Sequence, residues 1–208
     1  SDLENKFYLI LFFIISFVLS FFIIKNLDIN FLTYTVLIGS AFFLFFITVR
    51  DFFMKNSSNL SQKIAHLGFS LLILSILFNN IFSKEIITNL KVGETFMSNN
   101  FKISFENIEQ FNESNFRVIK GKFRIENSNG KTDFLNPELR IYDQPNIVTS
   151  EADIKTNLFL DKFMTMNYVQ NQEYFNIRYQ IKPFMIWIWF SVILISFGGL
   201  ISFIKKKI

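Results

Sequence analysis

One residue stands apart by its chemistry, because His66 is the only histidine in the chain and it lies among apolar residues. A neutral imidazole suits haem iron as an axial ligand, and the surrounding Phe, Leu and Ile side chains suit a porphyrin. On a helix His66 would share a face with Gln62, Lys63, Phe69, Ser70 and Ile73. A purely structural role is equally open, in which the ring hydrogen-bonds a neighbouring helix or lies among lipid headgroups.

Two features of the chain bear on the haem hypothesis. Lys63 lies about one turn before His66, where its ammonium could pair with a haem propionate, although a cytoplasmic membrane flank explains this lysine equally well. A haem held by two histidines would need a second His, which this chain does not contain. The second ligand would therefore come from another chain or from a missing segment.

No other chemistry is indicated by the residue types and their spacing. The chain has no Cys, which excludes a disulfide framework and a zinc finger. Its seven Gly show no phosphate-loop spacing, and its carboxylates form no conspicuous pair or metal-ligand cluster. We therefore assign no catalytic residue.

The element that positions His66 is one of four uncharged apolar runs. Each run is long enough to cross a hydrocarbon layer about 30 Å thick. We predict transmembrane helices over 7–24, 31–49 and 64–82, within a first region 1–82, and a fourth helix within 183–208.

The charges around these runs predict their orientation. Arg50, Lys55 and Lys63 flank the second and third runs, and Lys205–Lys207 follow the fourth. Basic flanks remain in the cytoplasm, which predicts cytoplasmic N- and C-termini and a segment 83–182 on the outer side. The net charge of +4 comes entirely from residues outside 84–182, beside the apolar runs. It therefore indicates a lipid bilayer as partner and no nucleic acid.

The outer segment 83–182 has the pattern of a β-domain. Apolar and polar residues alternate around Phe101–Phe105, Phe116–Val118, Phe123–Ile125 and Phe175–Ile181, which predicts half-buried strands. Asn127–Gly130 is a hairpin-turn signal. We expect six to eight short strands in a small all-β sandwich or partly open barrel. For Thr149–Ile154, a loop and one helical turn are both open.

Two short motifs in the fourth run have simple structural interpretations. Trp187 and Trp189 lie near its outer end, as expected of an aromatic belt at the membrane surface. Gly198 and Gly199 would permit close packing of helices.

Four separated motifs together carry a resemblance to a known family. They are Ala65-His66-Leu67-Gly68, Asn136-Pro137-Glu138-Leu139-Arg140-Ile141-Tyr142, Thr149-Ser150-Glu151-Ala152-Asp153-Ile154, and Lys182–Trp189 followed by Gly198-Gly199-Leu200. In this order and spacing the chain resembles the C-terminal part of the CcmF-type cytochrome c haem lyases of System I cytochrome c biogenesis. The resemblance is firmest from about residue 60 to 203.

This resemblance implies both a function and a site. Members of the family are inner-membrane proteins that receive haem from the chaperone CcmE. With CcmH-type partners, they attach it through thioethers to the CxxCH motif of apocytochrome c. They also hold a transmembrane b-type haem between two histidines, and His66 matches one of these two axial ligands to the iron. The resemblance therefore implies haem b as cofactor and a bacterial inner-membrane location with 83–182 in the periplasm.

The chain also departs from the family pattern. It lacks the tryptophan-rich haem-handling segment, the outer-side histidines and the first transmembrane histidine. We therefore expect part of a haem lyase complex that is not catalytically complete alone, either a fragment or a split-gene product that works with the N-terminal part of CcmF.

Two other functions are considered. One is a non-enzymatic membrane scaffold or sensor whose outer β-domain binds a protein partner. The other, a transporter permease subunit, fits less well because the spans contain few polar residues.

Overall fold

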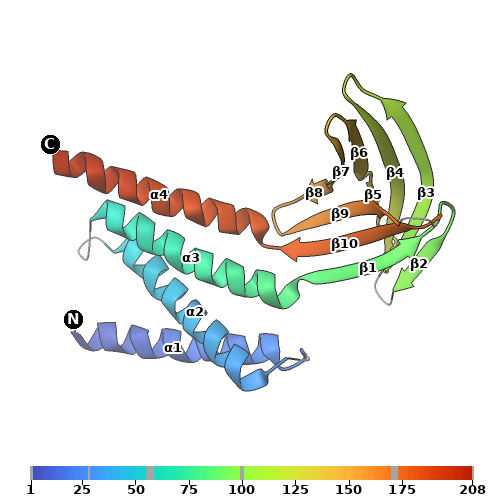
Figure 1. The fold of residues 1–208 in the computed structure, drawn as a ribbon. Coiled ribbons are helices and arrows are strands. Elements are labelled where there is room, and N and C mark those ends of the chain that lie inside the picture. The colour runs from blue at the N-terminus through green and yellow to red at the C-terminus, as the bar shows by residue number, and fades with distance from the viewer. Residues whose placement is uncertain (1, 28, 55–58, 99–100, 170–172, 208) are drawn as a thin grey trace. The chain divides into compact units, whose positions relative to one another are not determined.

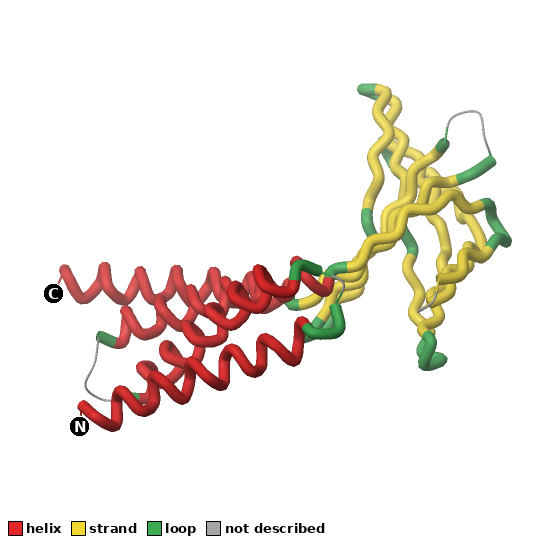
Figure 2. Tube along the Cα trace, turned by 90° about the horizontal axis from the view of Figure 1, so that it is seen from below, coloured by secondary structure: helices red, strands yellow, loops and turns green. Residues whose placement is uncertain are grey.

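The computed structural model describes residues 2–27, 29–54, 59–98, 101–169 and 173–207 (Figure 1). The chain divides into two compact units, one comprising residues 1–81 and 184–208 and the other residues 82–183. Helices are confined to the first unit and strands to the second, apart from the last residue of the third helix (Figure 2). The predicted combination of four apolar helices and a β-domain is therefore confirmed.

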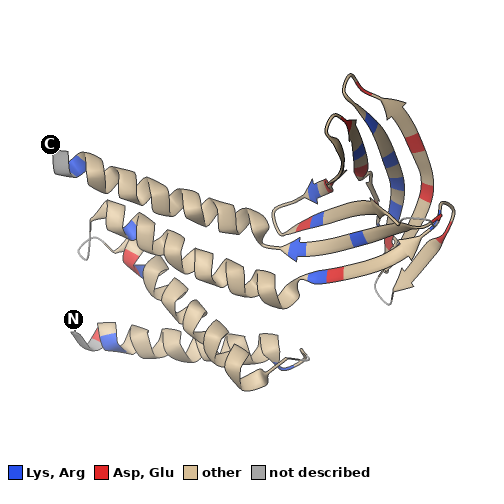
Figure 3. Ribbon diagram, viewed as in Figure 1, with Lys and Arg blue, Asp and Glu red and all other residues tan. Residues whose placement is uncertain are grey.

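The helical unit contains α1 (Asp2–Ile24), α2 (Phe31–Phe53), α3 (Leu60–Phe82) and α4 (Met185–Lys207). All four are long and apolar enough to cross a membrane, and their charged residues lie near their ends (Figure 3). α2 begins at Asn30, whose side chain accepts a hydrogen bond from the Thr33 amide at 3.2 Å. Lys55, which contributed to the orientation prediction, lies outside the described residues.

Small and hydroxyl-bearing residues join α1, α2 and α3. A Cβ on Gly39 of α2 would lie 2.9 Å from the ring of Phe17 in α1, so glycine allows that close contact. The hydroxyl of Ser20 donates to the Thr35 carbonyl at 2.7 Å, which also joins α1 to α2. The hydroxyls of Thr48 and Ser70 lie 2.6 Å apart and join α2 to α3.

α3 and α4 approach closely through two glycines. A Cβ on Gly68 would lie 2.9 Å from Cβ of Leu194, and a Cβ on Gly198 would lie 2.7 Å from the Ser61 carbonyl oxygen. A Cβ on Gly199 would meet no atom within 4 Å. Of Gly198 and Gly199, which were both expected to permit close packing, only Gly198 does so.

The β-domain contains ten strands in the part of the chain that the structure describes. They are β1 (Lys84–Leu90), β2 (Thr95–Ser98), β3 (Phe101–Asn112), β4 (Phe116–Asn127), β5 (Thr132–Leu135), β6 (Glu138–Asp143), β7 (Asn146–Glu151), β8 (Asp153–Thr156), β9 (Leu160–Tyr168) and β10 (Phe175–Pro183). One sheet has the order β1-β10-β9-β8 and the other β2-β3-β4-β6-β7, with β5 also paired to β4. We call these sheet A and sheet B.

The two sheets share one apolar core, as expected of a sandwich. Phe105 and Phe123 of sheet B stack with ring centroids 4.2 Å apart, and Phe105 meets Phe175 of sheet A edge to face at 5.7 Å. Ile103 and Ile177 are fully buried on the two inner faces. The period-two alternation predicted these inward-facing positions.

The predicted hairpin turn is confirmed, and the strand number differs from expectation. Gly130 has a φ of +74° in the turn that joins β4 to β5. The described residues form ten strands rather than six to eight, and the stretch Thr149–Ile154 is extended, with all its residues except Ala152 in β7 and β8. Both are edge strands with many exposed residues, so their sequence lacks the apolar alternation of a central strand.

The first and last strands of the domain are neighbours. β1 and β10 are antiparallel, with Lys84 opposite Ile181 and Leu90 opposite Phe175. A single residue separates α3 from β1, and Phe184 alone separates β10 from α4. Phe184 has a φ of +60°, in the left-handed region, where the chain passes from strand to helix.

One ion pair joins the sheets near the core. Lys162 of β9, 9% exposed, donates a hydrogen bond to Asp133 of β5. The Lys162 ammonium lowers the pKa of Asp133, and this outweighs the opposite effect of burial. Burial, followed by the nearby charge of Asp133, raises the pKa of Tyr179.

Replacement of Gly198 by Ala should destabilise the contact between α3 and α4 by about 1–3 kcal/mol, because its methyl group would overlap backbone of α3. The matched variant Gly199→Ala should be neutral or slightly stabilising, since alanine favours the helix by up to about 1 kcal/mol. Thermal unfolding of the helical signal in nanodiscs measures both. Equal stability of the two variants would contradict the proposed packing.

Replacement of Asp133 by Asn should cost about 1–2 kcal/mol, because a mostly buried ammonium loses its charged acceptor. The double variant Asp133→Asn with Lys162→Met should recover much of that loss, since no charge is then left unpaired. Urea unfolding of the β-domain signal in the reconstituted chain tests both. A double variant less stable than Asp133→Asn would refute the ion pair as the cause.

Candidate functional site

His66 lies on an exposed side of α3. Gln62, His66, Phe69 and Ile76 are all exposed, and their spacing of three, four and seven residues places them along one face of the helix. Phe69 is 53% exposed and Ile76 48%. We call these four residues the His66 face. The structure thus confirms that Gln62 and Phe69 accompany His66, whereas Lys63 and Ser70, expected on the same face, are buried.

Other positions of α3 are covered by α2 and α4. Gly68, two residues after His66, is buried at the contact with α4, and Ser70, one turn after His66, is buried at the contact with α2. Lys63 is only 8% exposed, and its ammonium donates to the carbonyl of Met54 at the end of α2. That carbonyl is at a helix C-terminus, where a cation is favoured. Lys63 is therefore engaged by α2, and the expected pairing with a haem propionate receives no support.

The His66 face can supply one metal ligand from an apolar surface. An imidazole on a membrane helix is costly to leave against hydrocarbon, which favours a partner for it. No group of three or more His, Cys, Asp or Glu that could hold a metal ion occurs among the described residues. His66 can therefore offer a single imidazole nitrogen as a ligand from this face.

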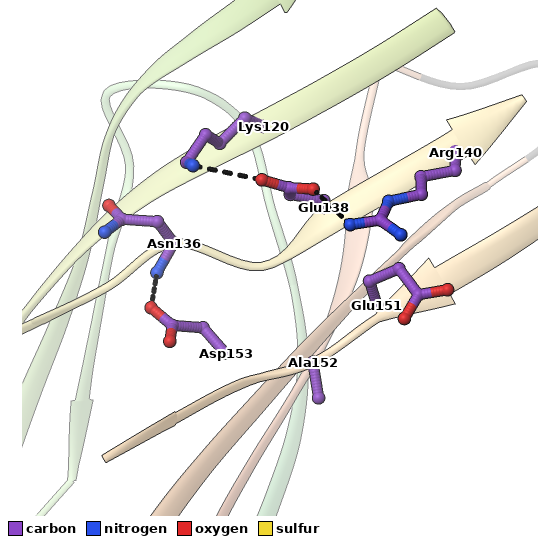
Figure 4. A pocket seen from close by; sticks show the side chains of 7 residues that line it. All are labelled: Lys120, Asn136, Glu138, Arg140, Glu151, Ala152 and Asp153. Atoms are coloured by element: carbon purple, nitrogen blue, oxygen red, sulfur yellow. Dashed lines mark hydrogen bonds and ion pairs between the residues drawn. The ribbon is translucent and has the colours of Figure 1, made fainter. Parts of the chain in front are cut away.

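The β-domain carries a second candidate site, an open pocket of about 400 Å³ on sheet B and its neighbour β8. Sequence reasoning assigned no role to any of its residues. The structure brings two of the motifs together there, because β6 and β7 are antiparallel with Glu138 opposite Glu151. The lining residues are Lys120, Asn136, Glu138, Arg140, Glu151, Ala152 and Asp153 (Figure 4).

Glu138 is the electrostatic centre of this pocket. It lies between Lys120 and Arg140, with one oxygen 3.0 Å from the Lys120 ammonium and the other 3.2 Å from the Arg140 guanidinium (Figure 4). Burial alone would raise the pKa of Glu138, but hydrogen bonds from Lys120 and Arg140 outweigh it and lower that pKa. Glu138 is thus held as a carboxylate and is poorly suited to act as a general acid.

Two further contacts fix residues that line the pocket. The backbone amide of Asn136 donates to the Asp153 carboxylate at 2.6 Å, which ties the connection between β5 and β6 to the start of β8. The Arg140 guanidinium lies 5.3 Å from the ring centre of Phe116. The pocket contains charged groups of both signs, so it can bind polar groups.

The chain resembles known proteins in both sequence and fold. Residues 81–183 match the family model described as the CcmF C-terminal β-sandwich. The chain is similar to cytochrome c-type biogenesis protein CcmF of Pseudomonas fluorescens, with 27% identity over 146 residues, which cover 70% of this chain and 22% of the relative. It is also similar to CcmF of Haemophilus influenzae, with 26% identity over 163 residues, which cover 78% of this chain and 25% of the relative.

A solved structure of cytochrome c haem lyase CcmF has a similar fold. It matches with a TM-score of 0.66 and 14% identity, and the match covers 92% of this chain and 33% of that chain. The present chain spans about a quarter of the length of the curated relatives that it matches.

Replacement of Glu138 by Gln should destabilise the β-domain by about 1 kcal/mol at neutral pH, because Lys120 and Arg140 lose their charged acceptor. The pKa of Glu138 is lower in the folded state than its ordinary value of 4.5. Its stabilisation is therefore fully present above that value and is lost as the pH falls through the folded pKa. Thermal unfolding of both chains between neutral pH and acid measures this difference, which should shrink in acid. The exposed carboxylate Glu113 supplies the control Glu113→Gln; an equal effect there would contradict a specific role of Glu138.

Proposed function

Because the chain belongs to the CcmF family and carries the C-terminal β-sandwich of that family, we propose that it works as the C-terminal portion of a cytochrome c haem lyase. One observation connects this proposal to a particular residue. His66 is exposed on α3, although α2 and α4 both pack against that helix. His66 is the chain's only histidine, and the close contacts of α3 with α2 and α4 are made by other residues of the helix.

His66 would be one axial ligand of a transmembrane haem b. Its imidazole is an ordinary haem ligand, and the exposed Phe69 and Ile76 on the same face offer apolar surface to a porphyrin. When bound, the haem supplies one-electron redox chemistry. The second axial histidine would come from the N-terminal part of CcmF, on the same polypeptide or on a split-gene partner.

The β-domain would position the components of haem transfer. In this proposal it holds CcmE, a CcmH-type subunit or apocytochrome c near the membrane, and the charged pocket around Glu138 offers polar contacts to such a partner. Haem joins apocytochrome c when each thiol of the CxxCH motif adds across one vinyl group, with its sulfur on one carbon and its proton on the other. We assign no residue of this chain to that step.

The proposed location is the bacterial inner membrane, with the β-domain in the periplasm and both termini in the cytoplasm. Arg50 lies in the last turn of α2 and Lys63 near the start of α3, where the connection between these helices would face the cytoplasm. Lys205 near the end of α4 supports the same side for the C-terminus.

The test is a reduced-minus-oxidised spectrum of this chain purified with a co-expressed N-terminal CcmF portion. The unmodified assembly should show a b-type α-band, and His66→Ala should lose most of it because the iron loses an axial bond. His66→Gly with added imidazole should recover part of the band, which a merely structural histidine would not explain.

Gln62→Ala is the matched control, since Gln62 is exposed one turn earlier on the same face. It should leave the band unchanged. A normal band in His66→Ala would show that the iron is held elsewhere. Absence of a band from the unmodified assembly, with both parts demonstrably associated, would favour the non-enzymatic scaffold instead.

A further inference from the structure

The turn between β8 and β9 has an unusual composition for an exposed turn. It runs from Asn157 to Leu160, and its tip residues Leu158 and Phe159 are each 63% exposed. The turn is well defined: the Asn157 amide donates to the Leu160 carbonyl at 3.0 Å. The Asn157 side-chain oxygen accepts from the amides of Phe159 and Leu160 at 2.9 Å each.

Other turns of the same domain are polar. Lys91–Glu94 joins β1 to β2 with a glycine at φ +88°, and Asn127–Gly130 joins β4 to β5. Turns in water normally use such residues, whereas two adjacent large apolar side chains at a tip indicate a surface that is covered by something.

The register of sheet A shows where this turn lies along the strands. Leu160 is opposite Pro183, the last residue of β10, so these two residues are about 5 Å apart across the sheet. β10 in turn places Ile181 opposite Lys84, the first residue of β1. The turn is therefore at the end of sheet A where the chain connects to both α3 and α4. α3 ends two residues before Lys84, and α4 begins two residues after Pro183.

Lysines surround the base of the turn. An open pocket of about 440 Å³ is lined by Asn157 at the turn and by Lys131, Lys155 and Lys162. Asp133 is the acidic residue in this lining. Lys131 and Lys155 are exposed, whereas Lys162 is paired with Asp133. Apolar residues at a tip, with lysines behind them, are the arrangement of a segment that enters a membrane interface.

We propose that the Asn157–Leu160 turn is a lipid-binding element of the β-domain. Leu158 and Phe159 lie at the boundary between headgroups and acyl chains, and Lys131 and Lys155 contact the phosphates of anionic lipids. The turn thus attaches sheet A to the bilayer at a third point, in addition to the covalent connections to α3 and α4. The occupant is lipid because the chain adjoining this end of the sheet forms helices that are apolar over a full membrane thickness.

This inference does not depend on haem or on His66. Its test therefore uses the 208-residue chain alone in lipid nanodiscs, and its failure would leave the proposed haem ligation untouched. The chain has no native Cys, so single labelling sites can be introduced without removing any residue.

The first experiment labels Leu158→Cys with an environment-sensitive fluorophore and measures quenching by spin-labelled lipids. The matched control is Val92→Cys, in the polar β1–β2 turn, where the side chain is 46% exposed. Val92 lies beyond the other end of β1, more than about 20 Å along the strand from Lys84. Quenching at 158 should exceed that at 92 by about twofold or more.

A second variant shows whether the apolar tip is the cause. Adding Phe159→Asp to labelled Leu158→Cys should abolish the excess quenching, while far-ultraviolet circular dichroism should stay unchanged because the turn is exposed. Equal quenching at 158 and 92 would overturn the proposal. So would a blue-shifted label at 158 without lipid quenching, because that result would mean burial against protein.

The lysine contacts are tested by lipid composition. Quenching at 158 should be stronger in phosphatidylcholine nanodiscs with about 25% phosphatidylglycerol than in phosphatidylcholine alone, because lysine ammonium groups are attracted to an anionic lipid surface. Lys131→Gln with Lys155→Gln should remove that difference. Quenching that is independent of lipid charge would overturn the assignment of these two lysines.

Discussion

The rotation of α3 about its own axis is the constraint on which the candidate haem site depends. Gly68 and Gly198 let α3 and α4 approach until backbone meets backbone, and the Thr48–Ser70 hydrogen bond holds α2 against α3. These contacts bury Gly68 and Ser70 in the interior of the helical unit. The His66 face is left exposed as a consequence.

The β-domain is built around its own constraint, which is that its chain both begins and ends at membrane helices. Pairing β1 with β10 satisfies this requirement, and β10 is thereby placed in the interior of sheet A. Sheet B then covers the inner face of sheet A with Phe105, Phe123 and their neighbours. The charged pocket around Glu138 and the apolar turn at Leu158 consequently belong to different regions of the domain, one on the strands of sheet B and one at an end of sheet A.

Most of the architecture could be predicted from the sequence. Uncharged apolar runs predict helices that cross a membrane, and period-two alternation predicts strands with one buried face. The number of strands could not be predicted, since β7 and β8 are edge strands whose exposed side chains carry little alternation. For the site, helical spacing correctly grouped His66 with Gln62 and Phe69. Spacing could not show that Lys63 is engaged by Met54, because that contact depends on how α2 returns to α3. The pocket around Glu138 draws on β4, β6, β7 and β8, so it becomes visible only once the strand register is known.

The pairing of β1 with β10 has a consequence for the order in which the chain can fold. During synthesis β1 follows α3 immediately, but its hydrogen-bonding partner emerges only after the rest of the β-domain has been made. Sheet B, whose strands are contiguous from β2 to β7, can assemble earlier from local hairpins. Closure of sheet A must wait until the ribosome reaches α4, so completion of the β-domain and arrival of the last apolar helix are coupled events in the biogenesis of this protein.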